Sequence, residues 1–121
     1  MTIIVSGANG YIGKAFLRRL LQKGHREIRA LVRSEKAKNE LTTEFEGLDV
    51  MIVDYLDRRS IDSALLEGAH LFHLVGTIRQ TREFSFREIH EDLCNAIVEA
   101  PTKLSKITSL SVTGASFHSI N

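Results

Sequence analysis

The chain has 121 residues, of which 43% are hydrophobic and 26% charged, and its formal net charge is +1. This composition is typical of a folded globular domain, and neither the charge nor the short apolar runs predict a nucleic-acid or membrane partner. The single cysteine, Cys94, excludes an internal disulfide and suits a reducing compartment, so we expect a cytoplasmic protein.

The first 21 residues combine a strand, a glycine-rich turn and a helix. Thr2–Val5 is rich in β-branched residues, and glycines follow at Gly7, Gly10 and Gly13. An amphipathic helix is predicted to begin near Tyr11, because apolar residues recur at helical spacing. They are Ile12, Phe16, Leu17, Leu20 and Leu21.

Strand, glycine turn and helix in this order are typical of a loop that binds the pyrophosphate of a dinucleotide. One glycine tolerates backbone angles that a Cβ atom would block, and a second lets the backbone approach the phosphates closely. A third lets the helix lie tightly against the strand. The start of the helix directs free N–H groups and the positive end of its dipole at the ligand. The spacing is Gly-x-x-Gly-x-x-Gly, not the commonest dinucleotide fingerprint.

Three other interpretations of the glycines differ in what they require of the neighbouring residues. A nucleoside-triphosphatase loop requires glycine at position 8 and a hydroxyl residue at position 15, where Ala8 and Ala15 stand. An S-adenosylmethionine methyltransferase usually has an acid at the end of its second strand, which this chain lacks. The third interpretation is structural, with the glycines turning a buried α/β unit and binding nothing.

The second strand is predicted at Glu27–Arg33, after a helix cap at Gly24. Folds of this kind bind the adenosine ribose at the end of that strand, where an acid favours NAD and an arginine favours NADP. No acid follows the strand before Glu35, so Arg33 predicts NADP, with Ser34 as a partner for the 2′-phosphate. The alternative is a solvated arginine at a strand end.

A short helix is predicted over Glu35–Phe45, a third strand over Leu48–Val53 and a second short helix over Arg58–Leu66. Asp54 follows the third strand and is placed to contact the adenine region. Asp57 is better explained as the N-cap of the next helix.

The fourth strand is predicted at Ala69–Val75. Its last residues, Leu74 and Val75, are expected to lie along the cofactor together with Gly76. A glycine at position 76 leaves room for a ribose or a nicotinamide to pass.

No metal site is predicted. The odd spacing of His70 and His73 sends their side chains to opposite faces of a strand. His90-Glu91 begins like a zinc-protease helix, but the position of the second histidine holds Cys94. We expect Cys94 to be a thiol of the core.

A long helix is predicted over Glu83–Ala100, where Pro101 stops it, and a fifth strand over Lys106–Val112. Strands that alternate with helices and are almost continuously apolar predict a parallel sheet covered on both faces. The fold class is therefore α/β, a doubly wound sheet of about five strands in order 3-2-1-4-5. The ligand crevice is expected outside the carboxyl ends of strands 1 and 4.

Five segments together resemble the amino-terminal half of the extended or atypical short-chain dehydrogenase/reductases, most closely the NmrA-like and nucleoside-diphosphate-sugar-epimerase-like branch. The segments are Gly7-Ala8-Asn9-Gly10-Tyr11-Ile12-Gly13, Leu31-Val32-Arg33, Asp54, His73-Leu74-Val75-Gly76 and Ser111-Val112-Thr113-Gly114-Ala115. The resemblance covers essentially the whole chain and implies one Rossmann-like domain, residues 1–121, that binds NAD(P). The cofactor contacts that motif and resemblance together suggest are Gly7, Asn9, Gly10, Tyr11, Ile12, Gly13, Arg33, Ser34, Asp54, Tyr55, Leu74, Val75, Gly76 and Ser111.

The chain departs from this family in its catalytic residues. Family members usually run to well over twice this length, and they use a Tyr-x-x-x-Lys pair just beyond the fifth strand. Here Tyr11 belongs to the glycine loop, and Tyr55 is followed by Arg59 four residues on. We therefore assign no catalytic residue and expect the domain to be incomplete, without its substrate-binding part.

Two functions follow from these features. The first is the NADP-binding domain of an oxidoreductase or of a sugar-nucleotide epimerase or dehydratase. The second is a non-catalytic NADP-binding module that senses redox state or acts as a scaffold. A sheet truncated after Lys106–Val112 leaves that strand as an exposed edge, so we also expect a homodimer.

Overall fold

The structure is a computed structural model that describes residues 2–74, 95–110 and 117–120. Its strands are β1 (Ile3–Ser6), β2 (Ile28–Val32), β3 (Asp49–Ile52), β4 (His70–His73), β5 (Lys106–Leu110) and β6 (Phe117–Ile120). Its helices are α1 (Tyr11–Gln22), α2 (Glu35–Glu44) and α3 (Arg58–Ala64). Residues 95–99 are also helical.

The described strands form one sheet in the order β3-β2-β1-β4-β5-β6. The pairs among β1 to β5 are all parallel, which confirms the predicted order 3-2-1-4-5. Strand β1 lies between β2 and β4. The chain adds β2 and β3 on one side of β1 and then returns to add β4 and β5 on the other side, so the strand order reverses at β1. Ligands of open α/β sheets bind outside the carboxyl ends of the strands at such a reversal, so the carboxyl ends of β1 and β4 are where a ligand is expected.

Strand β6 was not predicted, and it overturns the expectation that β5 is an exposed edge. It pairs with β5 in antiparallel register, from Ile107 opposite Ile120 to Leu110 opposite Phe117. Strand β6 is only four residues long, too short for its sequence to show a clear period. The outermost strands of the described sheet are therefore β3 and β6, and the reason given for a homodimer through β5 is lost.

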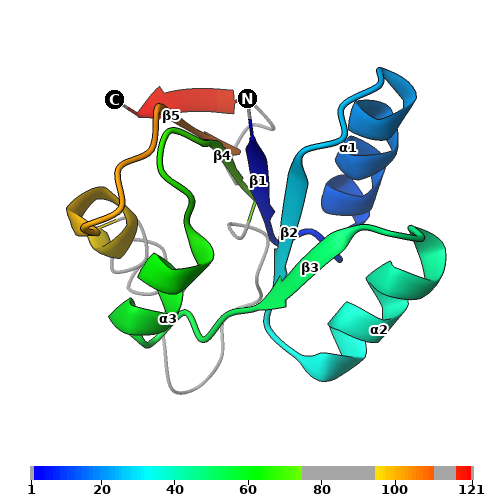
Figure 1. Ribbon diagram of the computed structural model, residues 1–121, viewed down its shortest axis with the longest axis horizontal. Coiled ribbons are helices and arrows are strands. Elements are labelled where there is room, and N and C mark those ends of the chain that lie inside the picture. Colours follow the sequence, from blue (N-terminus) through cyan, green and yellow to red (C-terminus); the bar gives the residue numbers. More distant parts are fainter. Residues whose placement is uncertain (1, 75–94, 111–116, 121) are drawn as a thin grey trace.

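Helices cover both faces of the sheet, with α1 and α2 on one side and α3 and the helical residues 95–99 on the other (Figure 1). The side chains of β1 alternate between two cores. Val5 packs in the core beneath α1 and α2, and Ile4 packs in the core beneath α3 and residues 95–99. All four residues of β1 are buried, as expected of a central parallel strand.

The ends of two helices test the predicted boundaries. Helix α1 is closed as expected, with Gly24 at φ +91° and the His25 amide donating to the Leu20 carbonyl. Helix α3 ends at Ala64, two residues earlier than predicted, because Leu65 turns to extended backbone and is buried in the core.

The fourth predicted helix, Glu83–Ala100, is described only in its last part. Residues 95–99 are helical, and Ala96, Ile97 and Ala100 are buried against the sheet. The expectations for His90, Glu91 and Cys94 lie outside the described residues.

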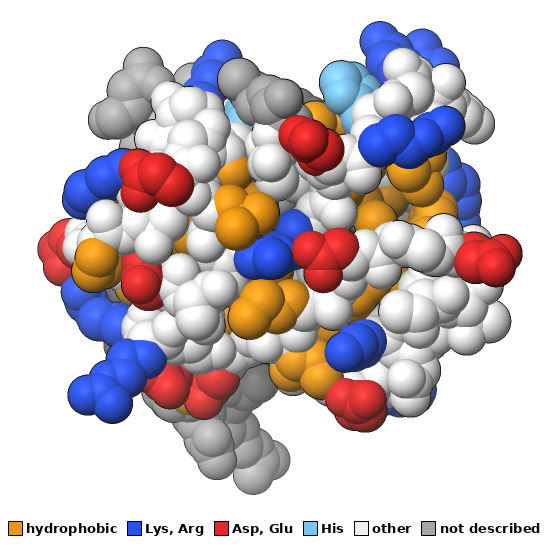
Figure 2. Space-filling model, viewed as in Figure 1, with side chains coloured by type: hydrophobic (Ala, Val, Ile, Leu, Met, Phe, Trp, Pro, Cys, Tyr) orange, Lys and Arg blue, Asp and Glu red, His pale blue; other side chains and the backbone are white. Residues whose placement is uncertain are grey.

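The surface carries both signs of charge. On the face shown in Figure 2, acidic and basic side chains lie among apolar ones, and neither sign forms a continuous field. This distribution agrees with the net charge of +1. In the described ranges, no helix has the length and apolar character needed to cross a bilayer.

Candidate functional site

The glycine loop connects β1 to α1 by a tight turn. Gly7 adopts φ +65°, in the left-handed region that favours glycine, and the Gly10 amide donates to the Gly7 carbonyl at 3.2 Å. The Lys14 amide then donates to the Gly10 carbonyl at 2.9 Å, which closes the first turn of α1. The structure therefore confirms the strand, turn and helix on which the loop interpretation depends.

Gly10 and Gly13 are glycines for different reasons. A Cβ atom at Gly13 would lie 2.4 Å from the Gly7 carbonyl oxygen and 2.7 Å from that of Ala8, so the helix could not approach the loop. At Gly10, by contrast, a Cβ atom would meet only the Gly7 oxygen at 3.5 Å, an ordinary contact. Within the described part of the chain, packing does not require glycine at position 10.

The first turn of α1 has free backbone donors. The Gly10 N-cap provides no side-chain acceptor, and no acid lies in the first turn. In the part of the chain that is described, no acceptor reaches the amides of Tyr11 and Ile12. The side chains of both residues are exposed, Tyr11 at 92%. An anion placed before this helix would meet free N–H groups and the positive end of the helix dipole.

Arg33 and Ser34 follow β2 directly, as predicted. Both are exposed, and the Ser34 hydroxyl caps α2 by accepting a hydrogen bond from the Ala37 amide at 3.1 Å. The capping role uses an acceptor site of the hydroxyl, so its proton is still available to a phosphate oxygen. Sequence reasoning named Ser34 as a ligand residue but did not identify it as the cap.

Tyr55 follows β3 and lies near the residues that follow β1 and β2. Its phenolic oxygen is buried and has no hydrogen-bond partner in the described ranges. Burial raises the pKa of Tyr55 to about 12, although the adjacent Gly7 backbone and the positive charge of Arg33 both lower it. The influence of Gly7 reflects proximity, since no hydrogen bond of good geometry forms. The structure thus brings together Gly7, Arg33 and Tyr55, which are far apart in sequence.

Asp54 begins the turn that leads from β3 to α3. One oxygen of its carboxylate accepts from the Leu56 amide at 3.0 Å, and its own amide donates to the Ser60 hydroxyl at 2.9 Å. The side chain is exposed, so the second oxygen faces solvent. Asp57 caps α3 as predicted, accepting from the Arg59 amide at 3.0 Å.

The end of β4 is tied to the end of β1 by a pair that sequence reasoning missed. The Ser6 hydroxyl lies 2.7 Å from Nδ1 of His73, and both side chains are about 1% exposed. The Leu74 amide donates to the Ser6 hydroxyl and to the Ser6 carbonyl, each at 3.2 Å. The only available signal was that Ser6 and His73 each precede a predicted cofactor segment. Val75, Gly76 and Ser111 lie outside the described residues.

His70 faces the other side of the sheet, as its spacing from His73 predicted. Its Nε2 lies 2.8 Å from the Thr108 hydroxyl, and its ring stacks on Phe72, with 4.0 Å between centroids. Burial and the charge of Lys106 lower the pKa of His70. In residues 2–74, 95–110 and 117–120, no three His, Cys, Asp or Glu side chains gather as a metal site requires.

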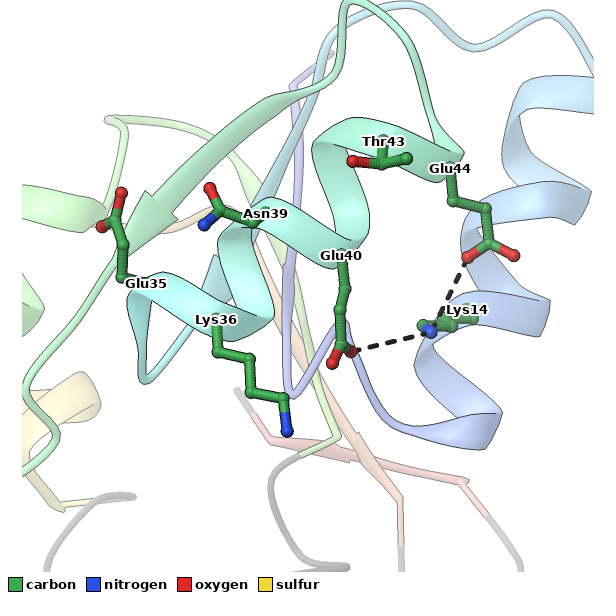
Figure 3. A pocket seen from close by; sticks show the side chains of 7 residues that line it. All are labelled: Lys14, Glu35, Lys36, Asn39, Glu40, Thr43 and Glu44. Atoms are coloured by element: carbon green, nitrogen blue, oxygen red, sulfur yellow. Dashed lines mark ion pairs between the residues drawn. The ribbon is translucent and has the colours of Figure 1, made fainter.

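A shallow groove of about 790 Å³ lies between α1 and α2 (Figure 3). Lys14 from α1 points into it and lies 4.0 Å from Glu40 and 3.8 Å from Glu44, both on α2. The groove is open and its lining carries two lysines and three glutamates, so it does not resemble the enclosed cleft of a cofactor. Because Lys14 is paired with α2, it does not take the place of the lysine in a nucleoside-triphosphatase loop.

Comparison with known proteins identifies a family. Residues 1–105 match the model of the NmrA-like family. No curated protein sequence matches the chain.

Solved structures share the fold. Triphenylmethane reductase from Citrobacter sp. is 24% identical over 86% of this chain and 36% of its own, with a TM-score of 0.67. The NADPH-dependent quinone oxidoreductase QOR2 from Escherichia coli is 24% identical over 89% of this chain and 36% of its own, with a TM-score of 0.66. Gre2 from Candida albicans is 25% identical over 90% of this chain and 35% of its own, with a TM-score of 0.71. The chain thus spans about a third of the length of these structures.

Proposed function

The chain belongs to the NmrA-like family, and on that premise we propose that it is the NADP-binding domain of an oxidoreductase or of an epimerase-like or dehydratase-like enzyme. The observation that carries this proposal is the open amino end of α1 behind the glycine loop. Among the residues that the structure describes, no acceptor pairs with the first amides of this helix, and a Cβ atom at Gly10 would meet only the Gly7 carbonyl oxygen.

Each part of the cofactor has its own set of residues. The pyrophosphate lies against Gly7, Gly10 and Gly13 and the amides of Tyr11 and Ile12, with Asn9 at the rim. Adenosine contacts Asp54 and Tyr55, and its 2′-phosphate contacts Arg33 and Ser34. The ribose and nicotinamide lie along Leu74, Val75, Gly76 and Ser111.

The convergence of Arg33, Tyr55 and Gly7 supports this assignment, because one dinucleotide must reach the ends of β1, β2 and β3 together. Bound NADPH would supply a hydride, and the residues of this chain would hold and orient it.

NADP is proposed over NAD because Arg33 directly follows β2 and no acid comes after this strand before Glu35. The solved neighbours support this choice. QOR2 is described as NADPH-dependent and in complex with NADPH, triphenylmethane reductase in complex with NADP(H), and Gre2 in complex with NADPH.

A second candidate function is cofactor binding without turnover, as in a redox sensor or a scaffold. One observation favours it. Neither tyrosine of the 121 residues has a lysine four positions later, since Ala15 follows Tyr11 and Arg59 follows Tyr55 at that spacing. The phenol of Tyr55 is also buried and held protonated by its raised pKa, which does not suit an acid–base catalyst.

Self-association through a sheet edge stays a proposal, but it now concerns β6 or β3 rather than β5. We propose no nucleic-acid or membrane partner and a cytoplasmic location.

The test is calorimetric titration of the purified chain with NADPH and separately with NADH. We expect NADPH to bind at least tenfold more tightly, because a charge-assisted contact between Arg33 and the 2′-phosphate contributes roughly 1.5–3 kcal/mol. Arg33→Ala should remove that preference. Arg26→Ala is the matched control, since Arg26 is exposed at the opposite, amino end of β2.

The results separate the two candidate functions. Binding of neither nucleotide would contradict cofactor binding altogether. Equal binding of both nucleotides would support the cofactor site but would show that Arg33 does not select NADPH over NADH. Reduction of any added acceptor by the chain alone would contradict the non-catalytic function.

A further inference from the structure

A buried polar row crosses the sheet at its ligand-binding end. Ser6 on β1, His73 on β4 and Ser109 on β5 are register partners in adjacent strands, and all three are buried. The neighbours of this row on the same face are apolar, including Ile4 and Leu71. Burying hydroxyl and imidazole groups costs free energy unless they are hydrogen-bonded, so apolar residues would stabilise the sheet more simply.

The hydrogen bonds of the row point to a role at the cofactor edge. The Leu74 amide already donates to the Ser6 hydroxyl, so that oxygen retains one proton to donate. Nδ1 of His73 lies 2.7 Å from the Ser6 oxygen, and we assign it as the acceptor of that proton. With Nδ1 as the acceptor, His73 is neutral and carries its own proton on Nε2. Ser6 is thereby fixed between the last residue of β4 and the amide that follows it.

The same contacts join the two segments between which a dinucleotide would lie. Ser6 immediately precedes Gly7 of the glycine loop, and Leu74 begins the segment assigned to the nicotinamide half. A change at His73 would shift one segment relative to the other, even though His73 itself does not reach the ligand. Positioning to within about half an ångström is what such supporting contacts provide.

We propose that His73 is a positioning residue that acts through Ser6 to hold Leu74 in the geometry required by the nicotinamide half of the cofactor. This inference rests on the proposed function, because it assumes that NADPH binds across β1 and β4.

A second histidine in the same strand provides a matched control. His70 also pairs with a hydroxyl, that of Thr108, at 2.8 Å, and it too lies between β4 and a neighbouring strand. His70 is at the amino end of β4 and on the other face, so its pair touches neither predicted cofactor segment. The two pairs therefore share their chemistry and differ in their position.

The experiment compares two ligands on each variant. NADPH spans the whole site, whereas adenosine 2′,5′-bisphosphate contains the adenosine, its 2′-phosphate and one phosphate, but no nicotinamide. In His73→Leu and in Ser6→Ala, we expect NADPH affinity to fall about tenfold, the scale of one buried hydrogen bond, while bisphosphate affinity changes less than about twofold. His73→Asn keeps an acceptor close to the position of Nδ1 and should restore most of the NADPH affinity. His70→Leu should change neither affinity.

The possible outcomes distinguish the positioning role of His73 from the proposed NADP-binding function. If the unmodified chain binds neither ligand, the proposed function fails and the inference fails with it. If the unmodified chain binds both but His73→Leu weakens both equally or neither, only the positioning role is overturned.

A measurement on the unmodified chain covers the case in which the variants do not fold. The ring nitrogens of His73, followed by ¹⁵N NMR, should show protonation at Nε2. Their resonances should move when NADPH is added and stay in place with the bisphosphate. A ring protonated at Nδ1, or equal movement with both ligands, would overturn the proposal.

Discussion

Gly10 and Gly13 lie three residues apart in one loop, and the structure separates what each contributes. Gly13→Ala should destabilise the fold by about 3 kcal/mol or more, because the new methyl group would overlap two backbone carbonyls that cannot move independently. Gly10→Ala should change the free energy of unfolding by less than about 1 kcal/mol, since its φ of −73° suits alanine and its contact is ordinary.

NADPH binding should show the opposite order. Gly10→Ala folds but places a methyl group where the pyrophosphate is proposed to lie, so its affinity should fall sharply. Urea unfolding and calorimetric titration of both variants measure the two effects. A Gly10→Ala variant with unchanged affinity would show that the phosphates lie elsewhere.

Tyr55 gives a prediction about alkaline stability. Because its pKa is raised from 10 to about 12 in the folded state, the unfolded chain loses this proton first as pH rises. Its contribution to stability is therefore complete below pH 10 and is lost between pH 10 and 12. At about 1.4 kcal/mol per pKa unit, the loss is at most roughly 3 kcal/mol.

Tyr55→Phe should remove this part of the pH dependence, so the stabilities of the two proteins should converge or cross above pH 10. Tyr11→Phe removes an exposed phenol and is the control. Its unfolding free energy should fall with pH as steeply as that of the unmodified chain. Chemical denaturation at pH 9, 10 and 11 gives the slopes. Equal slopes for the unmodified chain and Tyr55→Phe would mean that the phenol is solvated.

Residue types alone predicted the glycine turn and the cap at Asp57, because each depends on local geometry, whereas the role of Arg33 stays a prediction. Burial of the Tyr55 hydroxyl beside Gly7 could not be predicted, since it depends on how β3 is placed against β1 across β2. The pairing of Ser6 with His73 was missed for the same reason. Ser6 and His73 are 67 residues apart, and neither segment by itself predicts the register in which the two strands pair.

Among the elements, helix α2 begins at a side chain with two proposed roles, that of its N-cap residue Ser34. Ser34 caps the helix through its hydroxyl oxygen and is also proposed to donate to the 2′-phosphate of NADP. Two substitutions separate these roles. Ser34→Ala should lose both, with a cost of about 1 kcal/mol in stability.

Ser34→Asp should keep the cap, because aspartate is among the best N-cap residues and favours the positive end of the helix. It should nevertheless weaken NADPH binding by charge repulsion and shift preference towards NADH. Thermal unfolding together with titration of both nucleotides tests this pair. Retained NADPH preference in Ser34→Asp would place the 2′-phosphate away from the start of α2.

The elements themselves were predicted well where a pattern and a cap agreed. Helix α1 matches because its apolar face ends at a glycine that can adopt φ +91°. Helix α3 was predicted too long because Leu65 and Leu66 continue a helical pattern, and only packing decides that Leu65 turns inward as extended chain. Tertiary contacts outweighed local propensity at that end.

For the whole molecule, the prediction concerns the covered side of β5. A variant that ends at residue 116 lacks β6 and should expose the backbone donors and acceptors of β5. We expect this variant to self-associate, so at the same concentration its sedimentation coefficient should be larger than that of the full chain. Circular dichroism checks that the remaining sheet is folded, and an unchanged sedimentation coefficient would contradict the protective role of β6.

The architecture of the molecule was predictable because strands and helices alternate along the chain. Parallel strands need crossover connections, and because these are right-handed only a few strand orders are possible. Strand order and both helical layers were therefore predictable. The antiparallel strand at the end was not, because its four residues add no helix and no distinct pattern.

The position of β1 in the middle of the sheet has a consequence for the newborn chain. The partner that completes it on one side, β4, is made only after 67 further residues, as the spacing of Ser6 and His73 shows. At a translation rate of about 5–20 residues per second, that is roughly 3 to 13 seconds. During this interval a strand that is buried in the finished fold has an unpaired edge on the ribosome. Folding of this protein should therefore depend on chaperones that shield nascent chains, and slowing synthesis between β3 and β4 should lower its soluble yield.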